Sequence, residues 1–476
     1  MLRTIIEKEI RDIIGSSKFA ISFGVCAALI LLCFVTGAVN YKTSQAQYEA
    51  AKAENLRQME GLTDWFSVQQ HRIFLPPHPL ASLVSGVSND IGRTTEVRGR
   101  GELNADGSRY AEDPVYAVFR FLDLEFLFQV VLSLLAILLG YDAISGEKER
   151  GTLRLSFSNG LPRATYILGK LIGSFLALIV PLLLALAIGS LIYPILGVPL
   201  SGIDWLRLAL IILAGLLFVG AFLTLSVMVS AFTQRTSSSF LVLLVVWIGA
   251  VLIIPRASVL LAGRMVDVPS VDELASQKAR LASQLMEEDR TRMSEFNTPP
   301  AAPGEDFEPD KMLKLFNTFM DSLADARDKQ MAEFGGRLNE DRANKQQAQE
   351  RLAFSIARVS PSASFALATS ALAGTDMFLK EHYRDQTMDY QQEYGKFMKE
   401  KTGLNPGGRM VIMLRDDNEN EKPKEIDPSE MPAFKYAPPA FAESFGRAIF
   451  DLGLLAFFNL LFFTGSVFGF LRYDVR

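Results

Sequence analysis

The sequence predicts an all-α membrane protein with six transmembrane helices and a largely helical extracytoplasmic domain built from two loops. Of its 476 residues, 49% are hydrophobic and only 21% are charged. The hydrophobic residues form blocks of about 18 residues or more that are almost free of charge, as a bilayer-crossing helix requires. The predicted spans are residues 19–39, 124–141, 165–193, 205–231, 239–262 and 446–471.

The first block is expected to stay in the protein as an anchor, because no small-residue cleavage pattern follows it. It is preceded by residues 1–18, which are predicted to form a cytoplasmic amphipathic helix on the membrane surface. The isoleucines of its apolar face are Ile5, Ile6, Ile10, Ile13 and Ile14, and the charged residues opposite them are Glu7, Lys8 and Arg11.

The distribution of Lys and Arg predicts which ends of the spans face the cytoplasm. One set of short segments holds Arg3, Lys8, Arg11, Lys18, Lys148, Arg150, Arg154, Arg163, Arg235, Arg472 and Arg476. The short loop YPILGVPLSG, on the other side, holds none. We therefore expect a multi-pass protein of the bacterial cytoplasmic (inner) membrane with both termini in the cytoplasm, ending in a tail at residues 472–476.

Two long loops, residues 40–123 and 263–445, are then extracytoplasmic. In the larger loop, apolar residues recur at three-four spacing in two stretches separated by NTPPAAPGEDFEPD, whose prolines and glycine stop a helix. This pattern predicts an antiparallel pair of long helices between residues 265 and 358. Residues 361–378 are small and apolar but contain Ser, Thr and Gly, so we expect an interfacial or re-entrant helix instead of a seventh span.

Few residues within the spans indicate chemistry. Ionisable residues near span ends are expected at the membrane interface; they are Glu125, Asp204, Arg207 and Arg447. Cys26 and Cys33 both lie in the first span and cannot form a disulfide framework. The three histidines are scattered without metal-ligand spacing. No catalytic, cofactor-binding or metal-binding residues are predicted, and an intramembrane enzyme is disfavoured because the spans hold no Ser/His, paired Asp or metal cluster.

The loop at residues 142–164 is the most informative segment. It is short, rich in charge and held between two spans, so a force applied to it would move both helices. Gly146 and Gly151 bracket a single predicted helical turn. Such a loop suits docking of a cytoplasmic partner, although its composition alone also fits a solvated loop that only sets orientation.

This loop and the segment after it resemble the permeases of type-two ABC transporters, in the branch of type V exporter-like permeases for gliding motility and copper-enzyme maturation. The resemblance rests on D-x-I-S-G-E-K-E-R-G-T-L, S-N-G-L-P-R and I-L-G-K. The matching residues are Asp142, Gly146, Glu147, Glu149, Arg150, Gly151, Thr152, Leu153, Pro162, Arg163, Gly169 and Lys170. The family more often has a different turn where this chain has Gly160-Leu161-Pro162.

In that family the loop is a coupling helix that sits on an ATPase subunit. The resemblance therefore implies an ATPase interface formed by Asp142, Gly146, Glu147, Lys148, Glu149, Arg150, Gly151, Thr152, Leu153 and Arg163, with Gln234 and Arg235 from the second cytoplasmic loop. The phosphate-binding pattern G-x-x-x-x-G-K-[ST] does not occur in the sequence. ATP and Mg are accordingly expected on a separate polypeptide, with no cofactor on this chain.

The expected partners are two ABC ATPase subunits, a second permease copy or a paralogue, and the lipid bilayer. A periplasmic partner is compatible with the large outer loops, and no nucleic acid is expected. The leading hypothesis is a non-catalytic permease subunit of an ATP-driven exporter. The alternative is mechanotransmission, in which the ATPase drives the extracytoplasmic domain and no substrate crosses the membrane.

Overall fold

A computed structural model of the chain describes residues 2–65, 68, 71–88, 91–97, 104–106, 123–153, 157, 162–294, 309–402 and 425–472. In this part of the chain, six helices are long and apolar enough to cross a membrane. They run over Ser17–Arg57, Leu124–Glu149, Arg163–Ile195, Gly202–Phe232, Thr236–Met265 and Phe441–Leu471. The predicted fold class, a helical membrane protein with six spans and further helices beyond them, is confirmed.

The helix α10 (Gly202–Phe232) lies at the centre of the bundle. It contacts α6 (Ser133–Gly140), α9 (Arg163–Ile195) and α17 (Phe441–Leu471). The helix α2 (Ser17–Arg57) is much longer than its predicted span, because the helix-forming residues after position 39 continue it. Its 41 residues measure roughly 60 Å, twice the hydrocarbon thickness of a bilayer, so it extends well beyond the membrane.

Two of the spans contain an irregular turn. The second span consists of α5 (Leu124–Phe126), the π-helical turn η3 (Leu127–Leu132) and α6. The fifth consists of α11 (Thr236–Trp247), the π-helical turn η4 (Ile248–Ile253) and α12 (Ile254–Met265). Pro255 lies at the start of α12, directly after the π-helical turn η4. Because proline has no backbone N–H, it cannot donate the hydrogen bond that a regular α-helix would make to the preceding turn, and the wider η4 turn is tolerated there.

The helix α15 (Pro361–Ala373) is buried within the bundle against α10, α17 and η4. The ring of Phe365 stacks on Phe218, in the middle of α10, at 4.8 Å between centroids. The Thr369 hydroxyl donates to the Phe365 carbonyl at 2.9 Å, which satisfies a polar group away from water. An interfacial helix would leave one face exposed, so the buried position favours the re-entrant form of the prediction.

The sheet region comprises the antiparallel sheet β1-β2-β3, α16 (Met377–Thr402) and residues 425–440. The strands are β1 (His71–Phe74), β2 (Thr94–Val97) and β3 (Asn104–Asp106), with His71 opposite Val97 and Thr94 opposite Asp106. Two 3-10 turns flank this region, η2 (Pro79–Ser82) and η5 (Pro428–Glu430). In its core, Ile73 of β1 and Val97 of β2 join a cluster with Trp65 and with Tyr390 and Tyr394 of α16.

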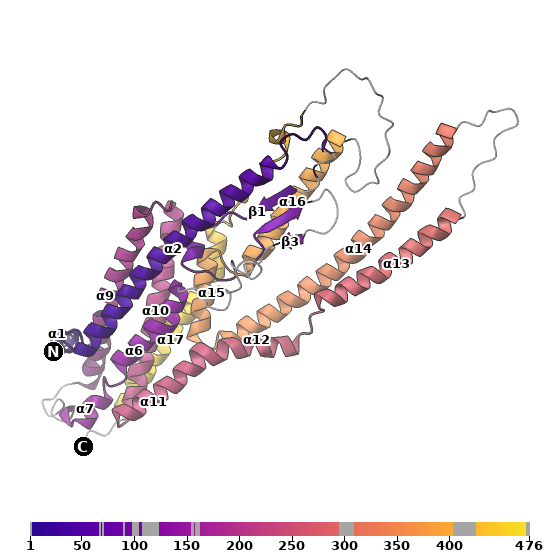
Figure 1. Ribbon diagram of the computed structural model, residues 1–476. Helices are drawn as coiled ribbons and strands as arrows, with labels where there is room; N and C mark the ends of the chain where they lie inside the picture. Colours follow the sequence, from indigo (N-terminus) through magenta and orange to yellow (C-terminus); the bar gives the residue numbers. More distant parts are fainter. Residues whose placement is uncertain are drawn as a thin grey trace.

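The two long helices predicted beyond the fifth span are α13 (Val271–Ser294) and α14 (Pro309–Ala357), which lie side by side as a hairpin (Figure 1). Arg327 pairs with Asp289 at 3.1 Å, and Lys278 donates to Asn339 at 3.3 Å. The base of α14 packs on α12. The linker predicted between the helices, residues 295–308, lies outside the described residues, as do residues 403–424 and 473–476.

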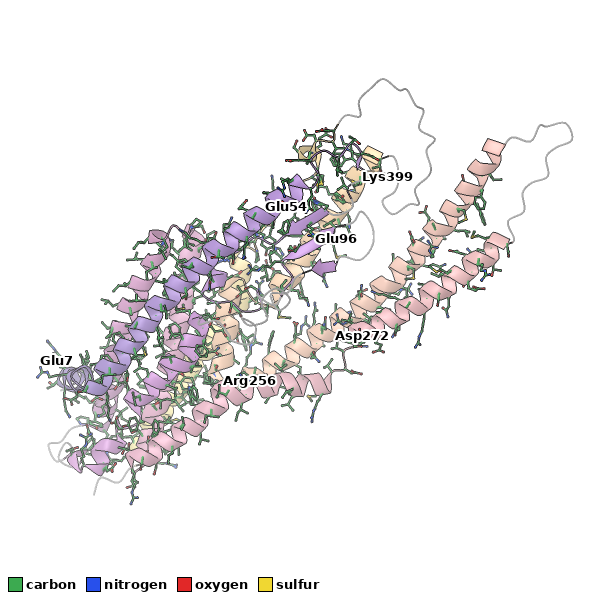
Figure 2. The ribbon with its side chains drawn as sticks, viewed as in Figure 1. Glu7, Glu54, Glu96, Arg256, Asp272 and Lys399 are labelled. Carbon is green, nitrogen blue, oxygen red and sulfur yellow. The ribbon has the colours of Figure 1, made fainter. Side chains whose placement is uncertain are left out.

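The bundle has two distinct ends. The helix α1 (Leu2–Ile14), α7 (Ser145–Glu149) and the last turn of α17 lie together at one end, called here the α7 end (Figure 1). Figure 2 shows Glu7 at this end, and Glu54 and Lys399 at the far end of α2 and α16.

Candidate functional site

The helix α7 is fixed to the end of α10 by its first residues. The Ser230 hydroxyl oxygen accepts hydrogen bonds from the backbone N–H groups of Ile144 and Ser145, at 3.0 and 2.9 Å. Both of these residues are buried. The predicted single turn of helix is therefore present, and it is bonded to a transmembrane helix that follows it by about 85 residues in sequence.

The next turn of α7 connects the two cytoplasmic loops of the prediction. Lys148 donates to the carbonyl oxygens of Ala231 and Thr233, the latter at 3.0 Å, and so caps the last turn of α10. The carboxylate of Glu149 accepts from the backbone N–H and hydroxyl of Thr236, at 3.1 and 2.9 Å, and caps the start of α11. The α10–α11 turn and α7 thus form one unit.

Glu147 points inward. Its carboxylate lies 3.0 Å from Lys170 Nζ of α9 and accepts a hydrogen bond from the Tyr166 hydroxyl. Lys170 also pairs with Glu9 of α1 at 3.2 Å. The side chains of these three charged residues are only 7–13% exposed. We call Glu9, Glu147, Tyr166 and Lys170 the buried charge cluster; it joins α1, α7 and α9.

Two glycines of α9 allow α1 to approach closely enough for these pairs to form. A Cβ atom at Gly169 would lie 2.6 Å from Ile5 Cγ2, and one at Gly173 would lie 2.7 Å from Glu9 Cβ. Ile5, Ile6, Ile10 and Ile13 of the predicted apolar face are partly buried, whereas Ile14 is exposed. Since α1 packs extensively on α9, it is more than a surface helix.

The remaining predicted interface residues have different environments. Arg150 and Thr152 of the first loop, and Gln234 and Arg235 of the second, are exposed. Gly151 is also exposed and adopts a φ of +72°, which ends α7. The four exposed side chains are called here the exposed α7 face. Glu149 is exposed as well, but its carboxylate caps α11. Arg150 and Thr152 also hydrogen-bond to backbone carbonyls within their own loop.

Leu153 is buried in a small apolar cluster with Tyr166 and Phe470. Asp142 is partly buried and Gly146 is buried. The Arg150 Nε donates a hydrogen bond to the Gly146 carbonyl at 3.1 Å. Arg163 donates to the Leu471 carbonyl at 3.1 Å and caps α17. Residues 154–156 and 158–161, including Gly160 and Leu161, lie outside the described residues.

Glu9 was not singled out from the sequence, because it appears there as one more charge on an amphipathic helix. Lys170 was noted only through the I-L-G-K match. The available signal was Lys170 itself, a charged residue five positions after the predicted start of the third span, flanked by Gly169 and Gly173. Within the described residues, no group of three or more His, Cys, Asp or Glu side chains is placed to hold a metal ion.

The fold and this site define a multi-spanning membrane protein in which the short helix α7 is bonded to the ends of three spans, α9, α10 and α11. The chain belongs to the ABC-2 family of transporter proteins, whose sequence profile matches residues 3–287. A second profile, Domain of unknown function (DUF3526), matches residues 314–425, which include most of α14, α15 and α16. The family profile therefore covers five of the spans and most of α13, and the second covers most of the later region between α13 and the sixth span.

The chain is also similar to the probable ABC transporter permease protein NosY of Stutzerimonas stutzeri. The two are 33% identical over 125 residues, which is 26% of this chain and 45% of NosY. The chain thus spans less than half the length of that relative. Together with the family profile, this similarity identifies an ABC transporter permease subunit.

Proposed function

We propose that this permease subunit couples ATP hydrolysis on two separate ATPase subunits to export of a substrate across the membrane, by docking an ATPase on the exposed α7 face. The supporting observation is the division of the α7 segment into two sides. Glu147, Lys148 and Glu149 bond to three other helices, whereas Arg150, Thr152, Gln234 and Arg235 are exposed.

This division suits transmission of force. A partner that pushes on the exposed side moves α7, and α7 cannot move without α9, α10 and α11, since each is bonded to it. Glu147 would act in this proposal through Lys170 and α9, and not by direct contact with the ATPase as the family resemblance implies. ATP and Mg would be bound by the partner, and this chain would take no catalytic part.

Charge reversal on the exposed α7 face tests the docking. In the double variant Arg150→Glu/Arg235→Glu, we expect co-purification of the ATPase to fall at least tenfold, since reversed charges at an interface repel the partner's complementary charges. Arg11→Glu is the matched control, because Arg11 is an exposed arginine of α1 outside this face. Full ATPase association in the double variant, with the amount of permease unchanged, would contradict the proposed interface.

The proposed orientation places the α7 end in the cytoplasm of a bacterial inner membrane and the α13–α14 hairpin outside. It is supported by the Lys and Arg asymmetry and by the common location of α1, α7 and the end of α17 (Figure 1). Single cysteines at Met286 and Thr152, in a protein without Cys26 and Cys33, test it. An impermeant thiol reagent applied to intact cells should label only Met286→Cys; the opposite labelling would invert the topology.

Two permeases are proposed per transporter, as a pair of ATPases requires, with the second a copy or a paralogue. The fifth span exposes apolar side chains to lipid or to that partner, among them Leu241, Val245 and Leu260. Native mass spectrometry of the complex in lipid nanodiscs would give its composition. One permease per pair of ATPases would contradict this stoichiometry.

Export itself is tested by comparing the compounds released by cells that carry the wild-type chain with those released by cells carrying Arg150→Glu/Arg235→Glu. The proposal predicts at least one compound that is released only with the wild type, and ATP-dependent uptake of that compound into inside-out vesicles. If the ATPase is stimulated by the wild-type chain but no compound moves, export is wrong and the mechanical alternative gains support.

A further inference from the structure

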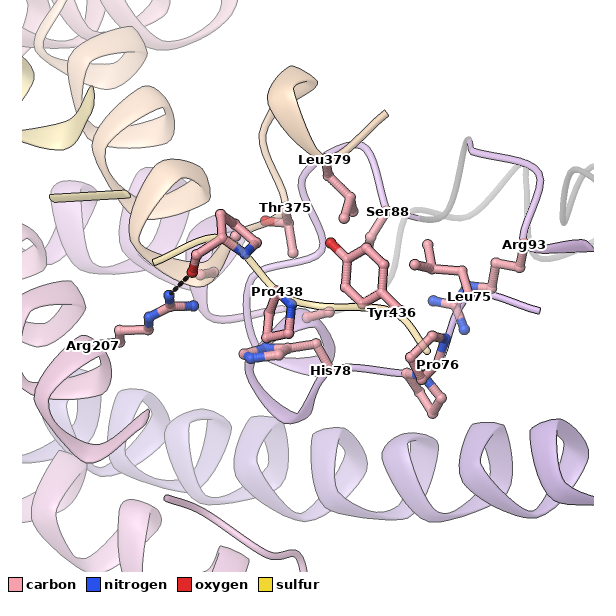
Figure 3. A pocket seen from close by; sticks show the side chains of 15 residues that line it. Leu75, Pro76, His78, Ser88, Arg93, Arg207, Thr375, Leu379, Tyr436 and Pro438 are labelled. Atoms are coloured by element: carbon pink, nitrogen blue, oxygen red, sulfur yellow. Dashed lines mark hydrogen bonds between the residues drawn. The ribbon is translucent and has the colours of Figure 1, made fainter. Parts of the chain in front are cut away.

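A small cavity lies at the end of the bundle opposite α7, where α10, the end of α15 and the sheet region meet (Figure 3). Its volume is about 30 Å³, which is room for a few non-hydrogen atoms. Leu75, Pro76 and Leu379 form part of its apolar wall. His78, Tyr436 and Arg207 contribute polar groups to the lining.

Arg207 is the notable residue of this lining. It lies near the start of α10, and its side chain is buried, with only 4% of the residue exposed. One guanidinium nitrogen, Nη2, donates to the Pro439 carbonyl at 3.1 Å, but the buried Nε–H has no hydrogen-bond partner. A buried guanidinium is costly unless it is paired and fully hydrogen-bonded.

The acidic residues nearby are engaged elsewhere. Asp204, one turn before Arg207 on α10, accepts hydrogen bonds from Ser201 at 2.8 and 2.9 Å and faces His78 at 3.6 Å. Asp376, which does not line the cavity, pairs with Arg447 through Oδ2 at 2.9 Å, and its Oδ1 is buried without a hydrogen-bond partner. Among the described residues, no carboxylate lies within ion-pair distance of the Arg207 guanidinium.

Two further buried atoms in the lining have no hydrogen-bond partner, the Tyr436 hydroxyl and His78 Nδ1. A guanidinium N–H can only donate, a tyrosine hydroxyl can donate or accept, and a neutral imidazole nitrogen donates or accepts according to its tautomer. The cationic Arg207 Nε–H and the Tyr436 hydroxyl could therefore both be satisfied by one negatively charged hydrogen-bond acceptor.

We propose that this cavity binds an oxyanion group, a carboxylate or a phosphate, between the Arg207 guanidinium and the Tyr436 hydroxyl. The bound group would supply the counterion that Arg207 lacks. It would also hold α10 to the segment that leads into α17, since Tyr436 lies five residues before that helix. This site is independent of the ATPase interface, which is at the other end of the bundle.

The test uses the full chain in phosphatidylcholine nanodiscs. Acetate and phosphate are titrated separately at constant ionic strength set with sodium chloride, and the thermal unfolding midpoint is recorded. We expect a saturable rise of the midpoint in the wild type, an affinity at least tenfold weaker in Arg207→Gln and about fivefold weaker in Tyr436→Phe. Lys435→Gln, which removes an exposed neighbouring charge outside the cavity, should behave as the wild type.

The source of the oxyanion is distinguished by a second arm, in which nanodiscs contain phosphatidylglycerol. Stabilisation by this lipid that is lost in Tyr436→Phe would assign a lipid headgroup; a response to acetate or phosphate alone would assign a free solute. Tyr436→Phe removes a single oxygen, so it keeps the test valid if Arg207→Gln does not fold. Equal responses of wild type, Tyr436→Phe and Lys435→Gln would mean that the cavity holds only water, and would overturn the proposal.

Discussion

At the α7 end, buried acidic and basic side chains form ion pairs, whereas in the sheet region the buried histidine is neutral and surrounded by aromatic rings. Lys170 lies between two carboxylates within 3.2 Å. His71 instead bonds to the Tyr390 hydroxyl at 2.7 Å and stacks on Tyr394. Burial lowers the pKa of His71 to about 4, so the imidazole is uncharged at neutral pH.

The difference shows what each end is built to do. A buried ion pair is no great source of net stability, but it fixes geometry, because neither charge can separate from its partner without a large penalty. The buried charge cluster therefore makes α1, α7 and α9 move as one. The aromatic core of the sheet region has no such constraint, and its stability depends on keeping one histidine neutral.

The largest expected effect is the loss of the central cation of the buried charge cluster. Lys170→Met leaves Glu9 and Glu147 buried without their main counterion, which should destabilise the folded state by about 3–5 kcal/mol. Thermal unfolding in nanodiscs and protease cleavage within α1 would measure it. Arg3→Met is the control, because its pair with Glu7 is exposed and worth less than about 1 kcal/mol. Equal losses of stability in the two variants would show that the buried charge cluster does not hold α1, α7 and α9 together.

Acid should weaken the sheet region. The pKa of His71 is near 6.5 in the unfolded chain and about 4 in the folded one, so between these values the unfolded state binds more protons. Stability contributed by neutral His71 is complete above pH 6.5 and is lost as pH falls towards 4. We expect a loss of about 2 kcal/mol at pH 5 relative to pH 7.

Hydrogen–deuterium exchange in peptides that cover β1 and α16 would measure this loss, with peptides from α9 as the internal reference. In His71→Gln, which does not titrate in this range, the exchange rates of the sheet region should change much less with pH. Identical pH dependence in the wild type and His71→Gln would mean that other groups control the response.

Much of the bundle and of the hairpin could be predicted from the sequence, because both depend on local pattern. Charge-free blocks define the spans, and three-four spacing with a proline-rich break defines α13 and α14. The sheet was not predicted, because strands of three or four residues, such as His71–Phe74, carry too little alternation to recognise. The helix α16 was also missed; its face is set by contacts with strands about 300 residues earlier in the chain.

The candidate site shows the same limit. The short charged helix predicted between two spans is present as α7, whereas the assignment of Glu147 to an ATPase interface came from the family resemblance alone. Whether a carboxylate faces outward or inward depends on what lies behind it, and here Lys170 and Tyr166 approach from another helix. No feature of the EKER segment itself distinguishes Glu147 from Glu149 or Arg150.

Smaller effects are expected from glycine-to-alanine substitutions, which compare the close packing of α1 on α9 with the open surroundings of α14 in the hairpin. In Gly173→Ala, the new Cβ would lie 2.7 Å from Glu9 Cβ and 3.3 Å from the Ile6 carbonyl oxygen, so α1 must shift, at a cost of about 1–2 kcal/mol. In Gly336→Ala on α14, nothing lies within 4 Å, and higher helix propensity should stabilise by up to about 1 kcal/mol.

Region-resolved hydrogen exchange would follow α1 in the first variant and α14 in the second. Gly24→Ala is a further control, since Gly24 lies in α2 with open space around it. If Gly173→Ala is as harmless as Gly24→Ala, then α1 is not held against α9 as described.

Site-specific photo-crosslinking in the assembled complex would show directly whether an ATPase subunit docks on the exposed α7 face. A photoreactive amino acid would replace Thr152 or Gln234 on that face, and Met286 on the hairpin as the control. We expect covalent products with the ATPase from Thr152 and Gln234 and none from Met286. An ATPase that remains bound but forms no product from either position on the face would contradict this docking.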